Sequence, residues 1–426
     1  DLATGATMMR CTRRRRSAAS SRLPHAHYRN YTGTIQNTRV AMLVACIAIQ
    51  ELYRKRAAMT TATPLAQQLR ARERTAPLHL VGLDAGNATA LLADGAQIIQ
   101  IPSYIGSGSL ADLLATRGGA GGAAALLPGE VAIEHAGQLF FVGDLALSQS
   151  RDASSARADT ARYANGHTLR LLMALVGIAY GGDVRLRIVT GVPPAVMKAQ
   201  PQIGTQIAES LLGTHYYVFH DLHGRHEIAL TIETVAVVME CVATLAALGE
   251  PGKPIGVLDI GGHTVDISWF DARGRVVDSR TDSLLGAGVD RVGEILSQQF
   301  RSQYGRALRP DEIQQLFQAY LAGEATTIYH RGPRVISADQ VHRAIGTVAA
   351  TINTFLGQRW GGGDGGVAAD GAYVLLVGGG ARFFPPFIQL DAPVRQSPRP
   401  EQDNAQSYAQ FAQRIQQRGT WPQPGR

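Results

Sequence analysis

Two aspartates, each followed by a glycine turn, are the residues of this sequence best suited to chemistry. Asp84 stands in the stretch 83–87, Leu-Asp-Ala-Gly-Asn, and Asp259 stands in 258–262, Leu-Asp-Ile-Gly-Gly. A hydrated magnesium ion needs such carboxylates, because it keeps much of its water shell and takes only one or two protein carboxylates beside the phosphates it accompanies. Either motif alone indicates an ordinary turn. The pair favours a phosphate site in which Asp84 and Asp259 position the metal.

Glycine is the second requirement of such a site. Bound phosphates need a close backbone approach and donated N–H groups, and a glycine turn supplies both because it has no Cβ atom and tolerates positive φ. A third glycine run, at 378–380, directly follows an apolar segment. The imidazole of His263, inside the second turn, could reach a phosphate oxygen or point to solvent. The predicted binding residues of the three turns are Gly86, Asn87, Gly261, Gly262, His263, Thr264, Gly378, Gly379 and Gly380.

Strands must hold these turns, and the apolar runs around them predict where the strands lie. The predicted strands are 78–83 and 89–93 around the first turn, 255–259 and 265–270 around the second, and 373–377 before the third. Apolar residues at helical spacing predict helices over about 162–180, 288–303, 310–322 and 337–356. Alternating helices and strands predict an α/β fold, and the likeness of the first two hairpins indicates a duplicated unit.

In these motifs the chain resembles the superfamily of actin, heat-shock chaperones and sugar kinases, and within it the plasmid-segregating actin-like proteins of the ParM/StbA type. Residues 81–87 resemble the first phosphate motif of that superfamily, 258–266 resemble the second, and 376–381 resemble the adenosine motif. A weaker similarity lies at 190–194, Thr-Gly-Val-Pro-Pro. The resemblance extends over roughly residues 78–387.

The resemblance implies a two-lobed actin-like α/β fold, made of duplicated RNase H-like domains, with ATP and Mg²⁺ in the cleft between the lobes. It implies slow ATP hydrolysis in which Asp84 and Asp259 hold the waters of the metal, while Glu233 orients the attacking water. Glu233 is equally well explained as the start of a helix. Unlike many relatives, the chain has Ala90 and Leu91 rather than a lysine directly after Thr89, so backbone amides and magnesium would have to neutralise most of the phosphate charge.

Four parts are expected along the chain. Residues 1–75 hold 14 Lys and Arg against 3 Asp and Glu, which predicts a basic arm or translated upstream sequence. The first lobe is expected over 76–186 and the second over 187–380, and the segment 381–426 is expected to return to the first lobe. After residue 75 the chain carries 27 basic and 31 acidic residues, so its body offers no general attraction for nucleic acid.

Composition argues against several other classes of protein. Three cysteines without C-x-x-C spacing indicate neither a zinc site nor a disulfide framework, which fits a reducing cytoplasm. No stretch reaches the roughly 18 apolar residues of a membrane span. Four histidines between residues 215 and 226 flank the segment 221–224, which predicts a surface hairpin and matches no zinc spacing.

Several functions are compatible with such a fold. A small-molecule kinase needs a carboxylate base beside a substrate pocket, and no sequence feature marks one. A chaperone needs a separate peptide-binding domain, for which the 45 residues beyond Ala381 are too few. We therefore expect a cytoplasmic protein whose partner is itself, in a filament that segregates plasmid DNA through a DNA-binding adaptor protein or serves as a cytoskeletal element. A non-polymerising regulatory ATPase is the alternative.

Overall fold

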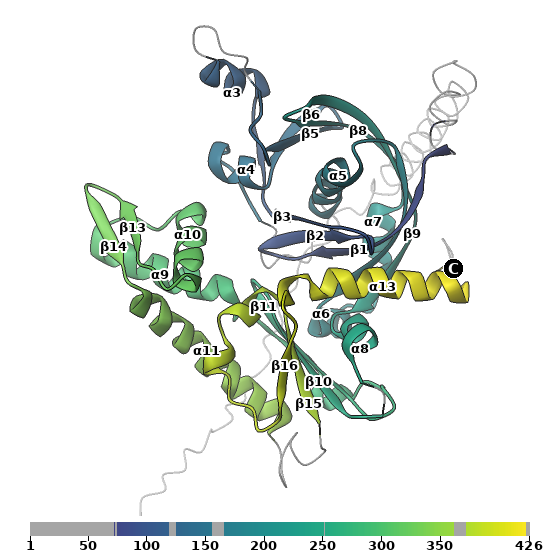
Figure 1. Ribbon diagram of the computed structural model, residues 1–426, viewed down its shortest axis with the longest axis vertical. Coiled ribbons are helices and arrows are strands. Elements are labelled where there is room, and N and C mark those ends of the chain that lie inside the picture. The colour runs from purple at the N-terminus through teal and green to yellow at the C-terminus, as the bar shows by residue number, and fades with distance from the viewer. Residues whose placement is uncertain are drawn as a thin grey trace, which may run out of the picture. The chain divides into compact units, whose positions relative to one another are not determined.

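Two separate β-sheets carry the glycine turns (Figure 1). The computed structural model describes residues 72, 75–118, 125–155, 166–250, 252–361 and 372–422, all within the unit formed by residues 68–426. We call the first sheet and its helices lobe 1, and the second sheet and its helices lobe 2. The expected arm, 1–75, lies outside the described residues except for Arg72 and Thr75, and Arg72 forms an ion pair with Asp183 of lobe 1.

Lobe 1 contains a nine-stranded sheet in the order β3-β2-β1-β7-β9-β8-β5-β6-β4. Its strands are β1 (Leu78–Ala85), β2 (Thr89–Ala93), β3 (Ile98–Pro102), β4 (Ile105–Ser107), β5 (Val131–His135), β6 (Gln138–Val142), β7 (Val184–Val192), β8 (Gly213–Asp221) and β9 (Gly224–Met239). Its helices are α3 (Leu110–Arg117), α4 (Asp144–Gln149), α5 (His167–Tyr180), α6 (Pro194–Ala199), α7 (Ile203–Leu211) and α8 (Val242–Leu248).

The core of lobe 1 forms where the curled sheet surrounds α5, as Figure 1 shows. From His167 to Gly177 every residue of α5 except Arg170 is buried. A helix that is apolar nearly all round needs partners on all sides, and the curl of the sheet supplies them. Gly177 allows this fit, because a Cβ atom there would overlap the ring of Phe219 on β8.

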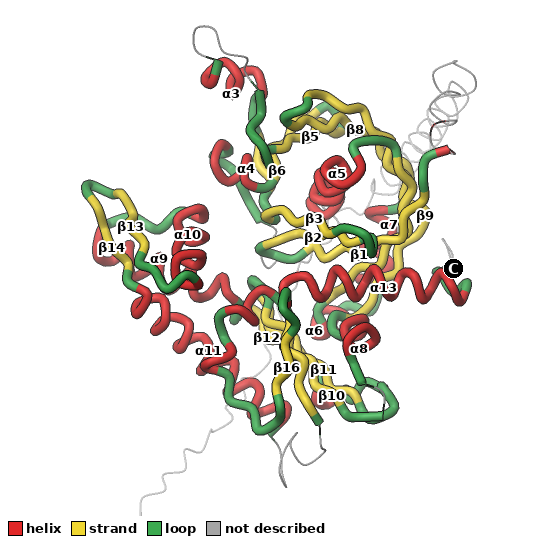
Figure 2. The backbone as a smooth tube through the Cα atoms, viewed as in Figure 1, coloured by secondary structure: helices red, strands yellow, loops and turns green. Residues whose placement is uncertain are grey.

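Lobe 2 contains a five-stranded sheet in the order β12-β11-β10-β15-β16 (Figure 2). Its strands are β10 (Ile255–Ile260), β11 (Thr264–Phe270), β12 (Asp282–Leu285), β15 (Tyr373–Val377) and β16 (Val394–Gln396), with a separate hairpin of β13 (Thr326–Tyr329) and β14 (Pro333–Ile336). Its helices are α9 (Val289–Tyr304), α10 (Pro310–Leu321) and α11 (Ala338–Trp360), with short 3₁₀ turns η2 (Asp278–Arg280), η3 (Gly379–Arg382), η4 (Pro385–Phe387) and η5 (Pro400–Gln402). Its core includes Trp269 and Trp360, whose rings meet edge to face at 5.7 Å.

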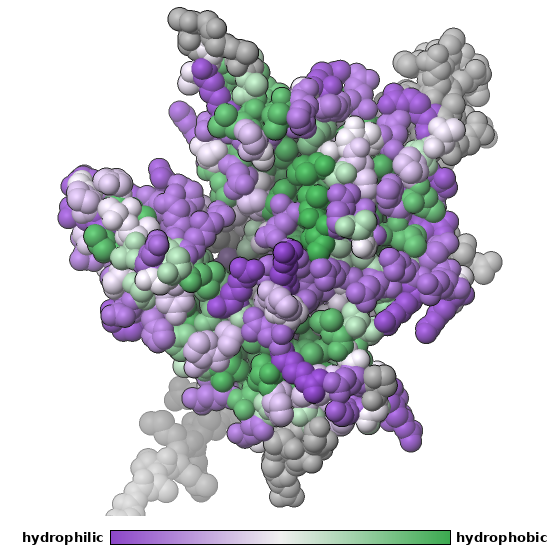
Figure 3. All heavy atoms as spheres, in the orientation of Figure 1, coloured by the Kyte–Doolittle hydropathy of each residue, from purple (hydrophilic) through white to green (hydrophobic). Residues whose placement is uncertain are grey.

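After lobe 2 the chain runs into α13 (Asp403–Arg418), which packs on β1, β2 and β7 of lobe 1. Small residues allow the helix to approach closely, because a Cβ atom at Gly82 of β1 would overlap the carbonyl oxygen of Ala405. The outer face of α13 is hydrophilic, with exposed Gln406 and Gln410 among its residues (Figure 3). The helix is therefore an amphipathic cover over the sheet of lobe 1.

The first sheet continues beyond the boundary that we expected after residue 186, which corrects the two lobe ranges. That boundary falls inside β7, which pairs in parallel with β1 on one side and with β9 on the other. The sheet of lobe 1 thus extends to Met239, at the end of β9. The physical reason lies in composition, since residues 228–239 are rich in Ile, Thr and Val, which favour strands. No helix among the described residues is long and apolar enough to cross a bilayer.

Candidate functional site

A cavity lies where the three glycine turns meet. The first turn contributes Asp84, Gly86, Asn87, Ala88 and Thr89, the second contributes Asp259, Gly261, Gly262, Thr264 and Asp266, and the third contributes Gly378 and Gly379. Parallel pairing explains the meeting, because the carboxyl ends of parallel strands lie at one edge of a sheet. In lobe 1 these are the ends of β1, β7 and β9, and in lobe 2 those of β10 and β15.

The carbonyl groups of the first turn are fixed by Ser103, which directly follows β3. Its hydroxyl donates to the Gly86 oxygen at 2.6 Å, and its amide donates to the Ala88 oxygen at 3.0 Å. In a trans peptide the C=O and the following N–H point in opposite directions. The N–H groups of Asn87 and Thr89 therefore point away from Ser103, and both residues line the cavity.

The second turn is built in the same way, with the start of α9 in the place of Ser103. Val289 N–H donates to the Gly261 oxygen at 3.1 Å, and Asp290 N–H donates to the Gly262 oxygen at 2.7 Å. The amides of Gly262 and His263 are consequently turned to the opposite side. Two turns with fixed carbonyls and outward amides form anion-binding concavities. They approach each other closely, because a Cβ atom at Gly262 would lie 2.9 Å from Ala88 Cβ.

The third turn begins with Gly378, whose φ of 83° lies in the left-handed region. A Cβ atom at this position would overlap Asp259 Oδ1, so glycine is required both by the backbone conformation and by the neighbouring carboxylate. The Gly378 N–H donates to the Pro400 oxygen at 2.9 Å. This bond ties the third turn to the segment that leads into α13.

Asp266 and Asp259 are the most deeply buried carboxylates of the cavity lining, with exposed fractions of 1% and 4%. Burial and, to a smaller extent, the charge of Asp266 raise the pKa of Asp259 to about 8, against a hydrogen bond from Asn404 that lowers it. Thr264 Oγ1 donates to Asp266 Oδ2 at 2.7 Å. A bound cation would therefore stabilise the ionised form of these buried carboxylates.

The charges of the lining decide which ligand fits. Five carboxylates line the cavity, and no Lys, Arg or His does so among the residues that the structure describes. A polyphosphate would be repelled unless a divalent cation accompanied it. No three His, Cys, Asp or Glu side chains of the described chain are grouped closely enough to hold a bare ion. The residues therefore fit a hydrated magnesium ion, which keeps most of its own waters. The five carboxylates that line the cavity are Asp84, Glu240, Asp259, Asp266 and Glu401.

Comparisons with known proteins agree with this geometry. Residues 82–242 match the family model "Actin like proteins N terminal domain", and residues 257–389 match "Archaeal actin homologue MreB-like, C-terminal". Together the two models cover more than half of the chain. The chain belongs to the actin-like superfamily. The first match ends just after β9, where the sheet of lobe 1 ends.

Solved structures confirm the predicted two-lobed actin-like fold. A 15-stranded ParM filament from Clostridium botulinum is 19% identical with a TM-score of 0.63, and covers 79% of this chain and 99% of its own. A non-polymerisable quadruple mutant of pCBH ParM is 17% identical with a TM-score of 0.61 and the same coverage. An archaeal actin homologue in complex with ADP is 18% identical with a TM-score of 0.58, again with the same coverage. A search of curated protein sequences found no significant match.

Most of the predicted site residues of this actin-like protein lie together at the cavity, but three do not. His263 and Gly380 are absent from the lining. Gly380 is buried beneath Ile260, where a Cβ atom would overlap that side chain, so its glycine serves packing. The third is Glu233. The residues that line the cavity as predicted are Asp84, Gly86, Asn87, Asp259, Gly261, Gly262, Thr264, Gly378 and Gly379.

Glu233, predicted to orient water, lies in β9 and forms ion pairs with Arg185 and Arg187 of β7. Burial alone would raise the pKa of Glu233, but hydrogen bonds from Arg187 and Arg185 hold this pKa below its ordinary value. The pairing of β7 with β9 skips Glu233, because Leu186 pairs with Ile232 and Arg187 with Thr234, so the glutamate lies at an irregularity of the sheet. It is neither a helix start nor a residue of the cavity, so its catalytic assignment is corrected.

Glu240 lines the cavity instead, seven residues further along the chain. It follows the last residue of β9, and its N–H donates to the Val192 oxygen at the end of β7 at 2.9 Å. Pro193, which directly follows β7, lines the cavity too. The sequence carried a usable signal, because a carboxylate directly after the apolar run 235–239 lies at the edge of the sheet where ligands bind.

The different positions of the two glutamates give a first prediction. Glu233→Ala should lower the free energy of unfolding by about 1 kcal/mol, because Arg185 and Arg187 are about one-third exposed and can be hydrated when their partner is lost. The rate of any ATP hydrolysis should remain at the wild-type value. Urea unfolding and a phosphate-release assay measure the two effects. A turnover loss of tenfold or more without unfolding would return Glu233 to the catalytic machinery.

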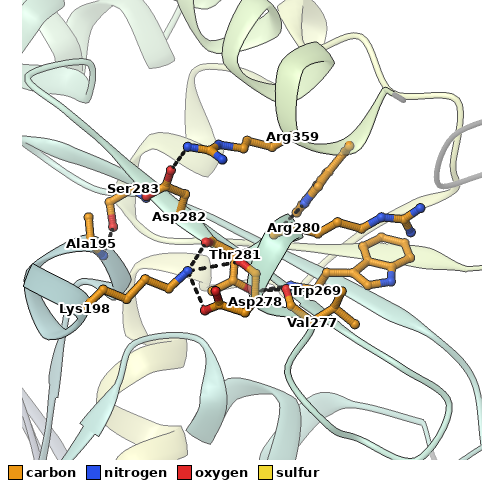
Figure 4. Close-up of polar contacts among 11 residues, drawn as sticks. Ala195, Lys198, Trp269, Val277, Asp278, Arg280, Thr281, Asp282, Ser283 and Arg359 are labelled. Carbon is orange, nitrogen blue, oxygen red and sulfur yellow. Dashed lines mark hydrogen bonds and ion pairs between the residues drawn. The ribbon is translucent and has the colours of Figure 1, made fainter. Parts of the chain in front are cut away.

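Beside the cavity, α6 joins lobe 1 to lobe 2, as Figure 4 shows. The Lys198 ammonium donates to the Thr281 carbonyl oxygen at 2.7 Å and pairs with Asp278 Oδ1 at 2.8 Å. Ala195 N–H donates to Ser283 Oγ at 3.0 Å. Because α6 directly follows Pro193 of the cavity lining, this contact links the cavity to the relative position of the two lobes.

Proposed function

We propose that this protein binds ATP with magnesium in the cavity and hydrolyses it slowly. The observation that carries the proposal is the meeting of two turns with fixed carbonyls and outward amides at a cavity lined by carboxylates without a basic side chain. Amides suit the phosphates, and the carboxylates suit the hydrated cation that must accompany them. An archaeal relative with the same fold was solved with ADP, which supports the choice of nucleotide.

In this proposal the chain contributes position and charge. Asp84 and Asp259 would hold the waters of the cation, and the outward amides of the first two turns would bind the phosphates. Magnesium, when bound, offsets the charge of the phosphates. Glu240 would hold the attacking water by a hydrogen bond and take up its proton as the bond to phosphorus forms. Phosphoryl transfer needs little more than such positioning and charge stabilisation, so slow turnover is expected.

We further propose that the nucleotide controls self-assembly into a filament. A ligand that contacts both lobes favours the arrangement in which they are closed. A surface made from both lobes then fits a second copy of the chain in one nucleotide state and fits it poorly in the other. A head-to-tail contact that does not close into a ring continues as a helical filament. The filament formed by the ParM relative supports this part of the proposal. Plasmid segregation would then use a DNA-binding adaptor, because the chain after residue 75 has more acidic than basic residues.

Light scattering and negative-stain microscopy test the assembly. We expect filaments with magnesium and ATP or a non-hydrolysable analogue, and disassembly in ADP. With time only the filaments made with the analogue should persist, because those made with ATP convert it to ADP. A protein that stays monomeric in all three states, while still stabilised against heat by magnesium and ATP, would be a regulatory ATPase without a filament. Loss of the thermal stabilisation as well would overturn the nucleotide site itself.

A further inference from the structure

Asn404, in the first turn of α13, lines the cavity and is 7% exposed. Its Nδ2 donates to Asp259 Oδ2 at 2.6 Å. Its Oδ1 accepts a hydrogen bond from Thr244 Oγ1 of α8 at 3.2 Å. With one bond on each side, the amide group is fixed, and it joins three elements that are distant in sequence: β10, α8 and α13.

The bond to Asp259 determines how that carboxylate is oriented. Asn404 takes Oδ2, while Oδ1 faces Gly378, where only the absence of a Cβ atom leaves room for it. When Asp259 is ionised, this hydrogen bond has a charged acceptor and is stronger than one between neutral groups. Without this donor Asp259 would keep its burial and its acidic neighbours Asp266 and Asp84, and would lose the group that holds it in place.

The residues just before Asn404 hold the third turn as well. The Pro400 oxygen accepts from the Gly378 N–H at 2.9 Å, and the Glu401 carboxylate accepts from Arg382 Nη2 at 2.6 Å. The body of α13 lies on lobe 1, where Ala405 and Tyr408 fit against Gly82 and Gly191. The start of α13 thus contacts the nucleotide turns of lobe 2, and the rest of the helix is anchored to lobe 1.

We propose that Asn404 is the positioning residue for Asp259, so that magnesium-dependent nucleotide binding requires the start of α13 to be seated against β10. The inference rests on the proposed nucleotide function and adds to it a role for the C-terminal helix. Asn404 contacts no reacting atom in this assignment and acts through the Asp259 carboxylate. Thr244 orients Asn404 in turn, and its helix α8 begins two residues after Glu240.

Three substitutions should weaken the positioning of Asp259 to different degrees. Asn404→Asp keeps the shape but sets a second carboxylate oxygen against Asp259 Oδ2. Asn404→Ala removes the donor, and Thr244→Val removes only the bond that orients the amide. The matched control is Asn353→Asp on α11, which loses a bond from Asn353 Nδ2 to the Phe387 oxygen of 2.8 Å inside lobe 2, away from the cavity lining.

The measurement is the magnesium concentration that gives half of the ATP-induced rise in melting temperature, at fixed ATP in the full chain. Asn404→Asp and Asn404→Ala should raise this concentration about 10- to 100-fold, and Thr244→Val by less, because groups that orient a metal-binding residue have effects of that size. Asn353→Asp should lower the melting temperature without nucleotide and leave the magnesium requirement unchanged, which separates positioning from stability.

Two results would overturn the inference. Asn404 variants with the wild-type magnesium requirement would show that the bond to Asp259 has no positioning role, while the nucleotide site itself would stand. An equal change in Asn353→Asp would attribute the effect to stability alone. If the wild-type chain showed no rise in melting temperature with magnesium and ATP, the proposed nucleotide function would fail first.

Discussion

Asp259→Asn should lower ATP turnover about a hundredfold or more and yet make the nucleotide-free protein more stable at pH 8. The loss follows because the substitution removes a carboxylate that would hold the waters of the cation, and groups that stabilise charge in a transition state are worth about 3 kcal/mol or more. The gain follows because the variant no longer buries a charge beside Asp266 and Asp84.

The gain in stability has a definite pH dependence. Burial raises the pKa of Asp259 to about 8 in the folded protein, from an ordinary value of 3.8 in the unfolded chain. The folded state therefore binds the proton more tightly, and wild-type stability falls as the pH rises from about 4 through 8. The asparagine variant has no proton to lose at this position. Its advantage in melting temperature should be large at pH 8 and small at pH 5.

Differential scanning calorimetry across this pH range, with and without magnesium and ATP, measures both effects. Asp271→Asn is the control, because that carboxylate is on the surface of lobe 2 and is bound to Arg275. It should change neither turnover nor the ligand-induced shift. A variant at Asp259 with undiminished turnover would remove this residue from the site. An advantage independent of pH would show that the buried charge is not its cause.

Glu240→Gln should keep nucleotide binding and slow ATP hydrolysis about a hundredfold, since a positioned acid or base contributes at least that much. Glutamine preserves the shape of the side chain and can still accept a hydrogen bond, but it cannot take up a proton. Filaments of this variant in ATP should therefore outlast those of the wild type and resemble filaments made with the non-hydrolysable analogue.

Single-turnover hydrolysis and the decay of light scattering after ATP addition measure these two consequences. Glu401→Gln is a useful comparison, because Glu401 also lines the cavity and forms an ion pair with Arg382. It should affect binding more than hydrolysis. Wild-type turnover in Glu240→Gln would show that Glu240 does not act on the attacking water. Short-lived filaments despite slowed hydrolysis would show that ATP hydrolysis does not control filament disassembly.

Local patterns predicted the turns well, because each turn combines an apolar strand with glycine and aspartate. The strands expected around Asp84 and Asp259 are present, and the hairpin predicted at 221–224 connects β8 to β9. The predicted helices over 288–303, 310–322 and 337–356 match α9, α10 and α11 closely. Such features depend on residues near one another in the chain, which is the range over which periodicity and capping act.

Pairing between distant segments was harder to predict. Glu233 and Glu240 lie in one β-rich stretch, and Glu240 reaches the cavity because it stands just beyond the end of β9, whereas Glu233 lies inside the strand. Asn404 carried no signal, because its partners Thr244 and Asp259 lie 160 and 145 residues away in the sequence. Long-range hydrogen bonds leave no local pattern, so the sequence could place the turns but could not identify all of the side chains that complete the site.

The packing of α13 on lobe 1 has a consequence for how the protein folds during its synthesis. Chains are synthesised from the N-terminus, and domains generally fold in that order. Here β1 is among the first strands made, yet the helix that covers it begins only at Asp403, after all of lobe 2. During translation the face around Gly82 stays open to water, so lobe 1 reaches its native packing only after lobe 2 has been synthesised. Nascent chains that stall in lobe 2 would expose this apolar face to chaperones or to one another.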